Sequence, residues 1–291
     1  MRLETPQRKM PLHLLRFALP IFHELQRVRF VTSKVGFDAR QKSERQPGSM
    51  SKTAGIVIIG NEVLSGKTQD TNSHFLCAEL RLLGVEVQKI STIPDDIETI
   101  GREVAEFSAR FDYVFTTGGV GPTHDDVTID GIAHGFGLKV VRHPAIESRI
   151  RQRVGVEVNE ARLRMANVPE GAELLAADAL FAPVVKIRNV YIFPGIPKIL
   201  EERFHAVKER FREEPYFMKV VYVRYGEGVI AALMNDLLAK YPAILLGSYP
   251  VLNVPEYKVK VTLESKDANY LDQALRAFLG SLPEGAVHRI E

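Results

Sequence analysis

Two short, unbroken apolar runs, each followed at once by glycine, constrain the fold of this chain more than any other feature. The first is Ala54–Ile59, which precedes Gly60, and the second is Tyr113–Thr117, which precedes Gly118. Short apolar runs without alternation are typical of strands buried on both faces of a parallel sheet. Between them, the apolar residues of Asn72–Leu83 recur at helical spacing. This alternation predicts an α/β fold with a doubly wound, mostly parallel sheet and helices on both faces.

Further elements are predicted along the same part of the chain. Ile97–Ala109 has the spacing of an amphipathic helix, and Ala145–Met165 also indicates a helix. Val184–Ile187 and Val190–Phe193 are short apolar runs joined by a two-residue link, which is a hairpin pattern. Asn167–Gly171 is predicted to be a turn.

A second pattern begins after Glu213-Glu214-Pro215. The order strand, helix, strand, strand, helix, strand is indicated over residues 215–291, with strict alternation in Tyr257–Leu263. This order is that of a small ferredoxin-like α+β module. We therefore divide the chain into a basic leader at 1–50, an α/β domain at 51–214 and a small β-α-β-β-α-β domain at 215–291.

The leader at residues 1–50 has a charge of its own. It holds ten Lys or Arg residues against four Asp or Glu residues, so the remaining chain is mildly acidic. Three interpretations stay open: an organellar targeting peptide, a solvated basic tail, or a chain whose true start is Met50. We favour the start at Met50, because Met50-Ser51-Lys52-Thr53 runs directly into the first strand.

Composition excludes several classes of protein. The single cysteine, Cys77, excludes an internal disulfide and a cysteine-cluster metal site, and it favours a reducing compartment. No run of about 18 uncharged apolar residues occurs, so no membrane partner is expected. The mildly acidic remainder argues against nucleic acid as a partner, because phosphate neutralisation needs clustered Lys and Arg. We expect a cytoplasmic protein, with the targeting interpretation of the leader kept open.

The strongest candidate site is the glycine-rich segment from Thr116 to Thr128, where a buried strand passes into a helix. Ligands of open α/β sheets bind outside the carboxyl ends of the strands, and glycines there let backbone N–H groups approach an anion. The predicted phosphate-binding residues are Thr117, Gly118, Gly119, Gly121 and Thr123. The alternative interpretation is an ordinary turn in which Asp125 or Asp126 caps the following helix.

A second loop, from Gly60 to Asn72, follows the first strand. It is not a P-loop, because five residues separate Gly60 from Gly66 and no helix is indicated at Lys67. Its acids lie at the same expected sheet edge as the glycine-rich segment. We predict that Glu62, Asp70 and Asp126 form a carboxylate group suited to Mg²⁺, which prefers few carboxylates plus substrate phosphates. The alternative is that these are solvated loop acids, with Thr71 or Asn72 capping the helix.

Taken together, these loops resemble those of the molybdopterin-binding-type fold. The resemblance covers about residues 54–291 and is close to the N-terminal domain of the competence/damage-inducible protein A family and to the molybdopterin-binding-like domain of eukaryotic FAD synthases. The matching segments are Gly60–Gly66, Thr68–Asn72, Phe75–Cys77, Thr117–Thr128, Val190–Pro197 and Gly247–Pro250.

The resemblance implies a function and a set of site residues. It implies phosphate contact by Gly118, Gly119 and Gly121, metal or catalytic roles for Glu62, Asp70 and Asp126, substrate contact by Asn72, Gly195 and Ser248, and a homo-oligomer. We expect a metal-dependent nucleotide pyrophosphatase acting on ADP-ribose, FAD or a similar dinucleotide. The alternative is a molybdopterin-binding protein, either a carrier or an adenylyltransferase-like enzyme. A third, non-enzymatic possibility is a nucleotide sensor.

Overall fold

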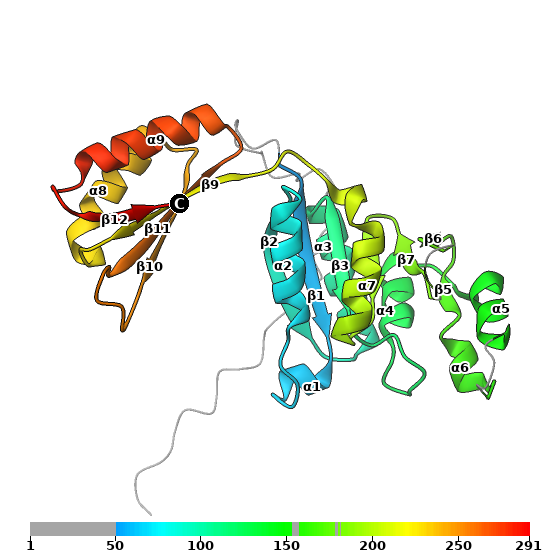
Figure 1. Ribbon diagram of the computed structural model, residues 1–291. Helices are drawn as coiled ribbons and strands as arrows, with labels where there is room; N and C mark the ends of the chain where they lie inside the picture. Colours follow the sequence, from blue (N-terminus) through cyan, green and yellow to red (C-terminus); the bar gives the residue numbers. More distant parts are fainter. Residues whose placement is uncertain (1–50, 153–156, 178–179, 181) are drawn as a thin grey trace, which may run out of the picture. The chain divides into compact units, whose positions relative to one another are not determined.

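The computed structural model describes residues 51–152, 157–177, 180 and 182–291 (Figure 1). The leader at 1–50 lies outside the described residues, so its three interpretations stay predictions. The first part of the chain forms a six-stranded sheet in the order β2-β1-β3-β8-β7-β6. Its strands are β1 (Thr53–Ile59), β2 (Glu86–Ile93), β3 (Tyr113–Thr117), β6 (Glu173–Leu175), β7 (Val184–Ile187) and β8 (Val190–Phe193).

Strand direction agrees with the sequence pattern. β1 pairs in parallel with β2 and β3, and β3 pairs in parallel with β8. The antiparallel pairs β7–β8 and β6–β7 complete one end of the sheet, so the predicted hairpin at Val184–Phe193 is confirmed. The predicted doubly wound, mostly parallel α/β architecture is confirmed as well.

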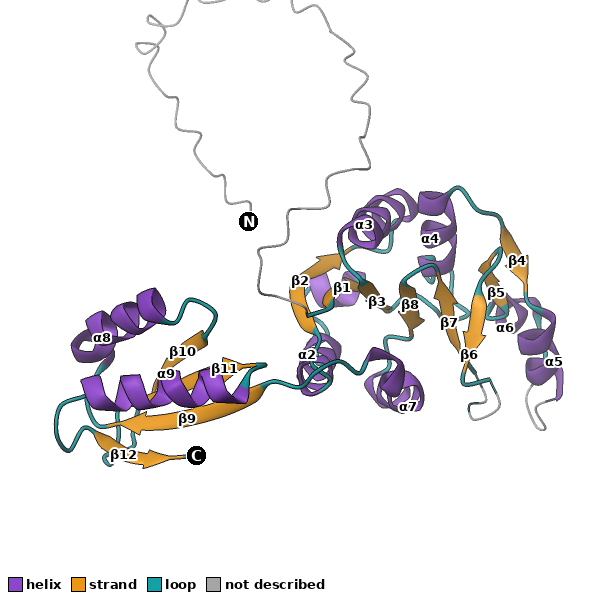
Figure 2. Cartoon of the chain, turned by 90° about the horizontal axis from the view of Figure 1, so that it is seen from above, coloured by secondary structure: helices purple, strands orange, loops and turns teal. Residues whose placement is uncertain are grey.

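Helices cover both faces of this sheet, as the view along the strands shows (Figure 2). α3 (Ile97–Arg110) and α4 (Thr128–Phe136) pack on one face, and α2 (Asn72–Leu82), α7 (Pro197–Val207) and the short 3₁₀ helix η1 (Lys208–Phe211) pack on the other. Side chains of β1 alternate between the two cores: Ile56 and Ile58 face α2, while Val57 and Ile59 face α3. Burial on both faces explains why β1 is apolar without interruption.

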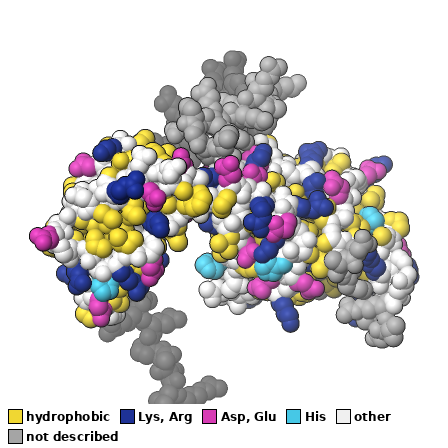
Figure 3. All heavy atoms as spheres, turned by 45° about the horizontal axis from the view of Figure 1, so that its top comes forward, with side chains coloured by type: hydrophobic (Ala, Val, Ile, Leu, Met, Phe, Trp, Pro, Cys, Tyr) yellow, Lys and Arg dark blue, Asp and Glu magenta, His cyan; other side chains and the backbone are white. Residues whose placement is uncertain are grey.

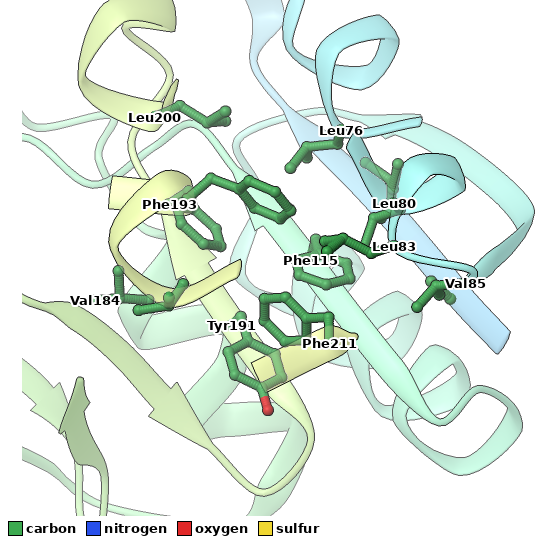
Figure 4. Close-up of a cluster of buried hydrophobic side chains, with 14 of the residues drawn as sticks. Leu76, Leu80, Leu83, Val85, Phe115, Val184, Tyr191, Phe193, Leu200 and Phe211 are labelled. Atoms are coloured by element: carbon green, nitrogen blue, oxygen red, sulfur yellow. The ribbon is translucent and has the colours of Figure 1, made fainter. Parts of the chain in front are cut away.

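An aromatic cluster fills the core beneath α7 and η1 (Figure 4). The ring of Phe211 lies edge-on to those of Phe115 and Tyr191, with centroids 5.0 and 4.8 Å apart. Phe115 and Tyr191 come from the neighbouring strands β3 and β8, and their rings stack at 5.6 Å. Edge-to-face and offset pairs of this kind are favourable beyond their buried area. The cluster fixes the strands whose ends carry the candidate site.

Two local predictions fail between residues 140 and 170. Asn167–Gly171 is not simply a turn, because β5 (Asn167–Pro169) pairs antiparallel with β4 (Val140–Arg142). The single helix predicted over Ala145–Met165 is replaced by α5 (Pro144–Gln152) and α6 (Glu160–Arg164). The side chain of Asn159 accepts a hydrogen bond from the backbone N–H of Arg162 at 3.0 Å, which starts a new helix.

The C-terminal part forms a separate four-stranded antiparallel sheet in the order β10-β11-β9-β12. Its elements are β9 (Phe217–Val223), α8 (Glu227–Lys240), β10 (Leu245–Pro250), β11 (Val259–Ser265), α9 (Ala268–Ser281) and β12 (Val287–Ile290). Both helices contribute to one core with Val221 and Val261 of the two central strands. The predicted β-α-β-β-α-β module is therefore confirmed.

Candidate functional site

The candidate site lies where the carboxyl ends of the parallel strands meet. β1 ends at Gly60 and the short helix α1 (Asn61–Leu64), while β3 ends at Gly118. β8 ends at the Pro194-Gly195 turn before α7. This edge is where ligands bind in open α/β sheets.

Gly118 and Gly119 give the glycine-rich loop a backbone that other residues rarely adopt. Their φ angles are +105° and +62°. A Cβ atom on Gly118 would collide with the carbonyl oxygen of Ile59, and one on Gly119 would collide with the hydroxyl of Thr128. Thr128 holds the loop in place, because its hydroxyl donates to the Gly118 carbonyl at 2.8 Å and its N–H donates to the Gly119 carbonyl at 3.1 Å. Glycine is therefore required at both positions.

The loop presents backbone donors. The N–H groups of Gly119, Val120 and Gly121 have no hydrogen-bond acceptor among the residues that the structure describes. The following helix, α4, has Val127 at its N-cap without any side-chain cap. The interpretation of Asp125 or Asp126 as the cap of α4 is therefore wrong. Free N–H groups beside an uncapped helix N-terminus form an arrangement suited to a bound anion.

Asp126 and Thr123 are bonded to each other. The Thr123 N–H and hydroxyl both donate to Asp126 Oδ2, at 2.8 and 2.5 Å. The same carboxylate lies over Gly121, where a Cβ would come within 2.5 Å of it. Gly121 thus leaves room for the carboxylate of Asp126, and the hydroxyl of Thr123 is directed at that carboxylate in this structure.

An acidic cluster surrounds Asp95, which follows the end of β2. The backbone N–H of Asn61 donates to Asp95 Oδ2 at 2.8 Å, so Asp95 connects the ends of β1 and β2. Burial raises the pKa of Asp95, and the nearby charges of Glu62, Asp125 and Asp126 raise this pKa further. The Asn61 hydrogen bond opposes the shift only in part. Several carboxylates therefore share one edge of the sheet.

Two of the three predicted metal ligands lie near Asp95, and the third, Asp70, has a hydrogen-bond partner of its own. Glu62 and Asp126 are neighbours of Asp95, whereas the carboxylate of Asp70 accepts from the N–H of Ser73 at 3.0 Å, at the start of α2. Within the described ranges, no three His, Cys, Asp or Glu side chains are arranged as a group that could hold a metal ion. The expectation of a metal at Glu62, Asp70 and Asp126 therefore stays a prediction.

Asn72 connects three segments at the site. Its Nδ2 group donates to the hydroxyl of Thr117 at 2.9 Å and to the carbonyl oxygen of Gly195 at 2.8 Å. The Thr117 hydroxyl in turn donates to the carbonyl of Pro194 at 2.9 Å. Asn72 is buried, and its Oδ1 atom has no hydrogen-bond partner in the described part of the chain. Asn72, Thr117 and Gly195 thus form one polar link beneath the loop.

Ser248 lies on β10 of the C-terminal module. Its hydroxyl donates to Glu227 Oε1 at 2.5 Å, within the same module. The structure gives Ser248 a local partner, so its expected contact with a substrate stays a prediction.

Sequence reasoning missed Asp95 and Thr128. A signal for Asp95 was present: it comes two residues after β2, and β2 runs parallel to β1, so both strand ends meet the same edge. Thr128 is fully buried beneath the glycine-rich loop. Its role depends on the loop's path and could not be found from spacing.

Surface features bear on the expected partners. Among the described residues, no helix is long and apolar enough to cross a membrane. On the face that Figure 3 shows, acidic and basic side chains are interspersed over the surface. The exclusion of nucleic acid and membrane partners stays a prediction from composition.

Comparisons with known proteins agree with this fold. Residues 55–213 match the family model described as "Probable molybdopterin binding domain". The chain therefore belongs to this family. Residues 215–291 match a second model, described as the middle domain of FAD synthase.

Relatives come from all three domains of life. The chain is 36% identical to a "Probable FAD synthase" of Caenorhabditis elegans, over 76% of this chain and 48% of that protein. It is 36% identical to a protein of Archaeoglobus fulgidus, over 77% of this chain and 95% of that one. It is 31% identical to a "CinA-like protein" of Thermotoga maritima, over 80% of this chain and 59% of that one. The chain spans about half the length of the nematode FAD synthases it matches.

A solved structure is similar as well. The crystal structure of the protein CinA from Thermoplasma acidophilum, described as having unknown function, matches with a TM-score of 0.51 and 29% identity. The match covers 56% of this chain and 100% of that one. The predicted resemblance to competence-type proteins and to FAD synthases is therefore confirmed.

Proposed function

We propose that this protein hydrolyses the pyrophosphate linkage of ADP-ribose, FAD or a similar dinucleotide, with a divalent metal. The observation that supports this most is the pairing of free N–H groups at Gly119, Val120 and Gly121 with the acidic cluster around Asp95, at one sheet edge. N–H groups suit phosphate oxygens, and carboxylates suit a cation that also contacts phosphate. The nematode relatives carry a name that concerns FAD, one of the two proposed substrates.

The acidic residues fit a metal that is shared with the substrate. Mg²⁺ is commonly bound by one or two carboxylates plus substrate phosphates, so a group of three protein ligands is not needed. Glu62 and Asp126 would hold the ion together with the phosphate oxygens, and without the ion the charges of these two residues would repel a phosphate. When bound, the metal neutralises charge on the phosphate oxygens and makes phosphorus easier to attack.

The residues of the chain would act by position and charge. The N–H groups of the glycine-rich loop would hold the pyrophosphate and stabilise the charge that develops on its oxygens. A water oxygen forms a bond to one phosphorus atom, the bridging P–O bond breaks, and its electron pair leaves with the second phosphate. One water proton is released to the solvent. The products are AMP and ribose 5-phosphate from ADP-ribose, or AMP and FMN from FAD.

An end-point assay tests this proposal. The full chain is incubated with ADP-ribose or FAD, each with Mg²⁺ or Co²⁺, and AMP is measured by chromatography. Asp126→Ala and Glu62→Ala are expected to lose at least about 90% of the activity. Asp236→Ala, which removes an exposed carboxylate of α8, is the matched control and is expected to keep it. The proposal fails if no AMP forms, or if Asp126→Ala keeps full activity.

A second candidate function is that of a molybdopterin-binding protein, as a carrier or an adenylyltransferase-like enzyme. The description of the matching family model favours it. The same loop serves both functions, so ligand identity must distinguish them. Oxidised extracts of the purified protein would show pterin fluorescence if it binds molybdopterin. If the extracts show no pterin fluorescence and the protein forms AMP, the pyrophosphatase is the supported function.

A further inference from the structure

A hollow borders the glycine-rich loop. Gly119, Val120 and Gly121 form one wall. The helices α5, α6 and α7 supply Arg149, Arg164 and Arg203 to other walls. Three arginines from three helices therefore line a hollow beside the loop that we propose binds phosphate.

Two of these arginines lack a protein partner. Arg149 donates from Nη1 to the carbonyl oxygen of Leu180 at 3.0 Å. Arg164 and Arg203 make no hydrogen bond or ion pair with any residue that the structure describes. Arg164 is exposed, so water satisfies it, but Arg203 is partly buried. Burial lowers the pKa of the Arg203 guanidinium from its ordinary value.

A partly buried cation without a hydrogen bond or ion pair is unfavourable, because it loses water, and the charge of Glu202 offsets this loss for Arg203 only in part. An anionic ligand would remove this cost. A guanidinium group has several donors in a planar fork, which matches the oxygens of a phosphate group. Two acids, Asp126 and Asp130, also line the hollow, so the anion must lie on the arginine side.

Apolar side chains form another part of the lining. They include Ile129, Met165, Val185 and Ile192. Small-molecule sites commonly combine such apolar walls with a few charged groups that fix the ligand's orientation. The occupant therefore has an apolar or planar part as well as an anionic group.

We propose that this hollow is a subsite for the phosphomonoester group of a nucleoside monophosphate, held by Arg203 and Arg164, with the ring system against the apolar wall. Both products of the proposed hydrolysis carry a phosphomonoester, so the inference deepens the proposed function and rests on it for the ligand class. The subsite would hold one product after the pyrophosphate bond breaks. Anion binding itself does not depend on turnover.

Titration calorimetry of the full chain with AMP and with adenosine tests this assignment. EDTA is present, so that no divalent cation can hold the phosphate at the acidic cluster. Wild type is expected to bind AMP at least about tenfold more tightly than adenosine. Arg203→Gln and Arg164→Gln are expected to weaken AMP binding at least about tenfold and fivefold, and to leave adenosine binding unchanged.

Arg210→Gln is the matched control, because it removes an exposed positive charge from η1, outside the hollow. The proposal is overturned if Arg210→Gln weakens AMP binding as much as Arg203→Gln, or if wild type does not prefer AMP to adenosine. Thermal unfolding checks that Arg203→Gln is folded. Because Arg164 is exposed, Arg164→Gln is expected to fold normally and gives a second test of the subsite. If the two arginine variants lose AMP binding but wild type hydrolyses neither ADP-ribose nor FAD, the proposed pyrophosphatase activity is refuted and the proposed subsite is retained.

Discussion

Asn72 offers the sharpest test of how the site is held together. Replacing it with alanine removes both hydrogen bonds donated by Nδ2, to the Thr117 hydroxyl and to the Gly195 carbonyl. The substitution also removes the buried Oδ1 atom, which has no partner among the described residues. We expect Asn72→Ala to lower stability moderately and ligand affinity strongly.

The magnitude follows from these contacts. Each lost hydrogen bond lowers the free energy of unfolding by about 1 kcal/mol, and removing the unpartnered oxygen offsets part of the loss. A net loss of about 1–2 kcal/mol corresponds to a fall in Tm of about 2–8 °C for a domain of this size. Asn72 holds Thr117 and the Gly195 carbonyl in place beneath the glycine-rich loop, so affinity for ADP-ribose should fall at least about fivefold.

Asn189 is a matched control from the opposite edge of the sheet, in the link between β7 and β8. Its Nδ2 donates to the carbonyls of Ser108 and Phe111 at 3.0 and 2.9 Å, and its Oδ1 accepts from the Ser108 hydroxyl at 2.6 Å. Because Asn189 makes three hydrogen bonds and has no unpartnered atom, Asn189→Ala should lower the free energy of unfolding by about 3 kcal/mol. It should change ligand affinity less than twofold.

Urea unfolding and titration calorimetry on the full chain measure both quantities. If Asn72→Ala leaves stability within about 0.5 kcal/mol of wild type, the polar link beneath the loop does not stabilise the fold. If Asn189→Ala weakens ligand binding as much as Asn72→Ala, the effect on affinity comes from general destabilisation, and our reasoning about the site is refuted.

Three further outcomes are expected. Gly118→Ala should lower the free energy of unfolding by at least about 2 kcal/mol in urea, because φ is +105° and the new Cβ meets the carbonyl of Ile59; wild-type stability would contradict the loop geometry. Because the pKa of Asp95 is raised, the folded state binds the proton of this carboxyl group more tightly than the unfolded chain does. Wild type therefore loses stability as the pH rises through the raised pKa. Asp95→Asn lacks this loss, so in EDTA its stability relative to wild type should be higher at pH 7 than at pH 3; an equal difference at both would refute the shift. Asp70→Asn should lower stability by about 1 kcal/mol through its bonds to Ser73 and keep the rate of AMP formation within about threefold; a loss of hydrolysis with normal stability would return Asp70 to the catalytic group.

Much of the fold could be predicted because its signals are local. β1 is a continuous apolar run after Thr53, β3 begins with the apolar run Tyr113–Phe115, and α3 has its apolar residues at helical spacing. β4, β5 and β6 were missed, since each has only three residues and gains its partner from a distant segment. A strand of that length has too few positions to show a period.

The candidate site was predicted in part for the same reason. Glycines at the end of β3 are visible in the sequence, and the positive φ angles of Gly118 and Gly119 agree with that choice of residue. The association of Asp70 with Glu62 was inferred from their presence in one loop. In the structure Asp70 is bonded at the start of α2 and Glu62 belongs to α1, so their association stays a prediction.

The sequence by itself determined the alternation of strands and helices, the second small module, and the loops that end the parallel strands. These properties depend on hydrophobic period and on glycine, which act within a few residues. Only the tertiary structure decided that Asp95 lies near the charges of Glu62 and Asp126, that Asn72 reaches Gly195, and that Arg203 and Arg164 line the same hollow beside the glycine-rich loop. Such meetings depend on strand order and on helix packing, which bring together side chains that are distant along the chain.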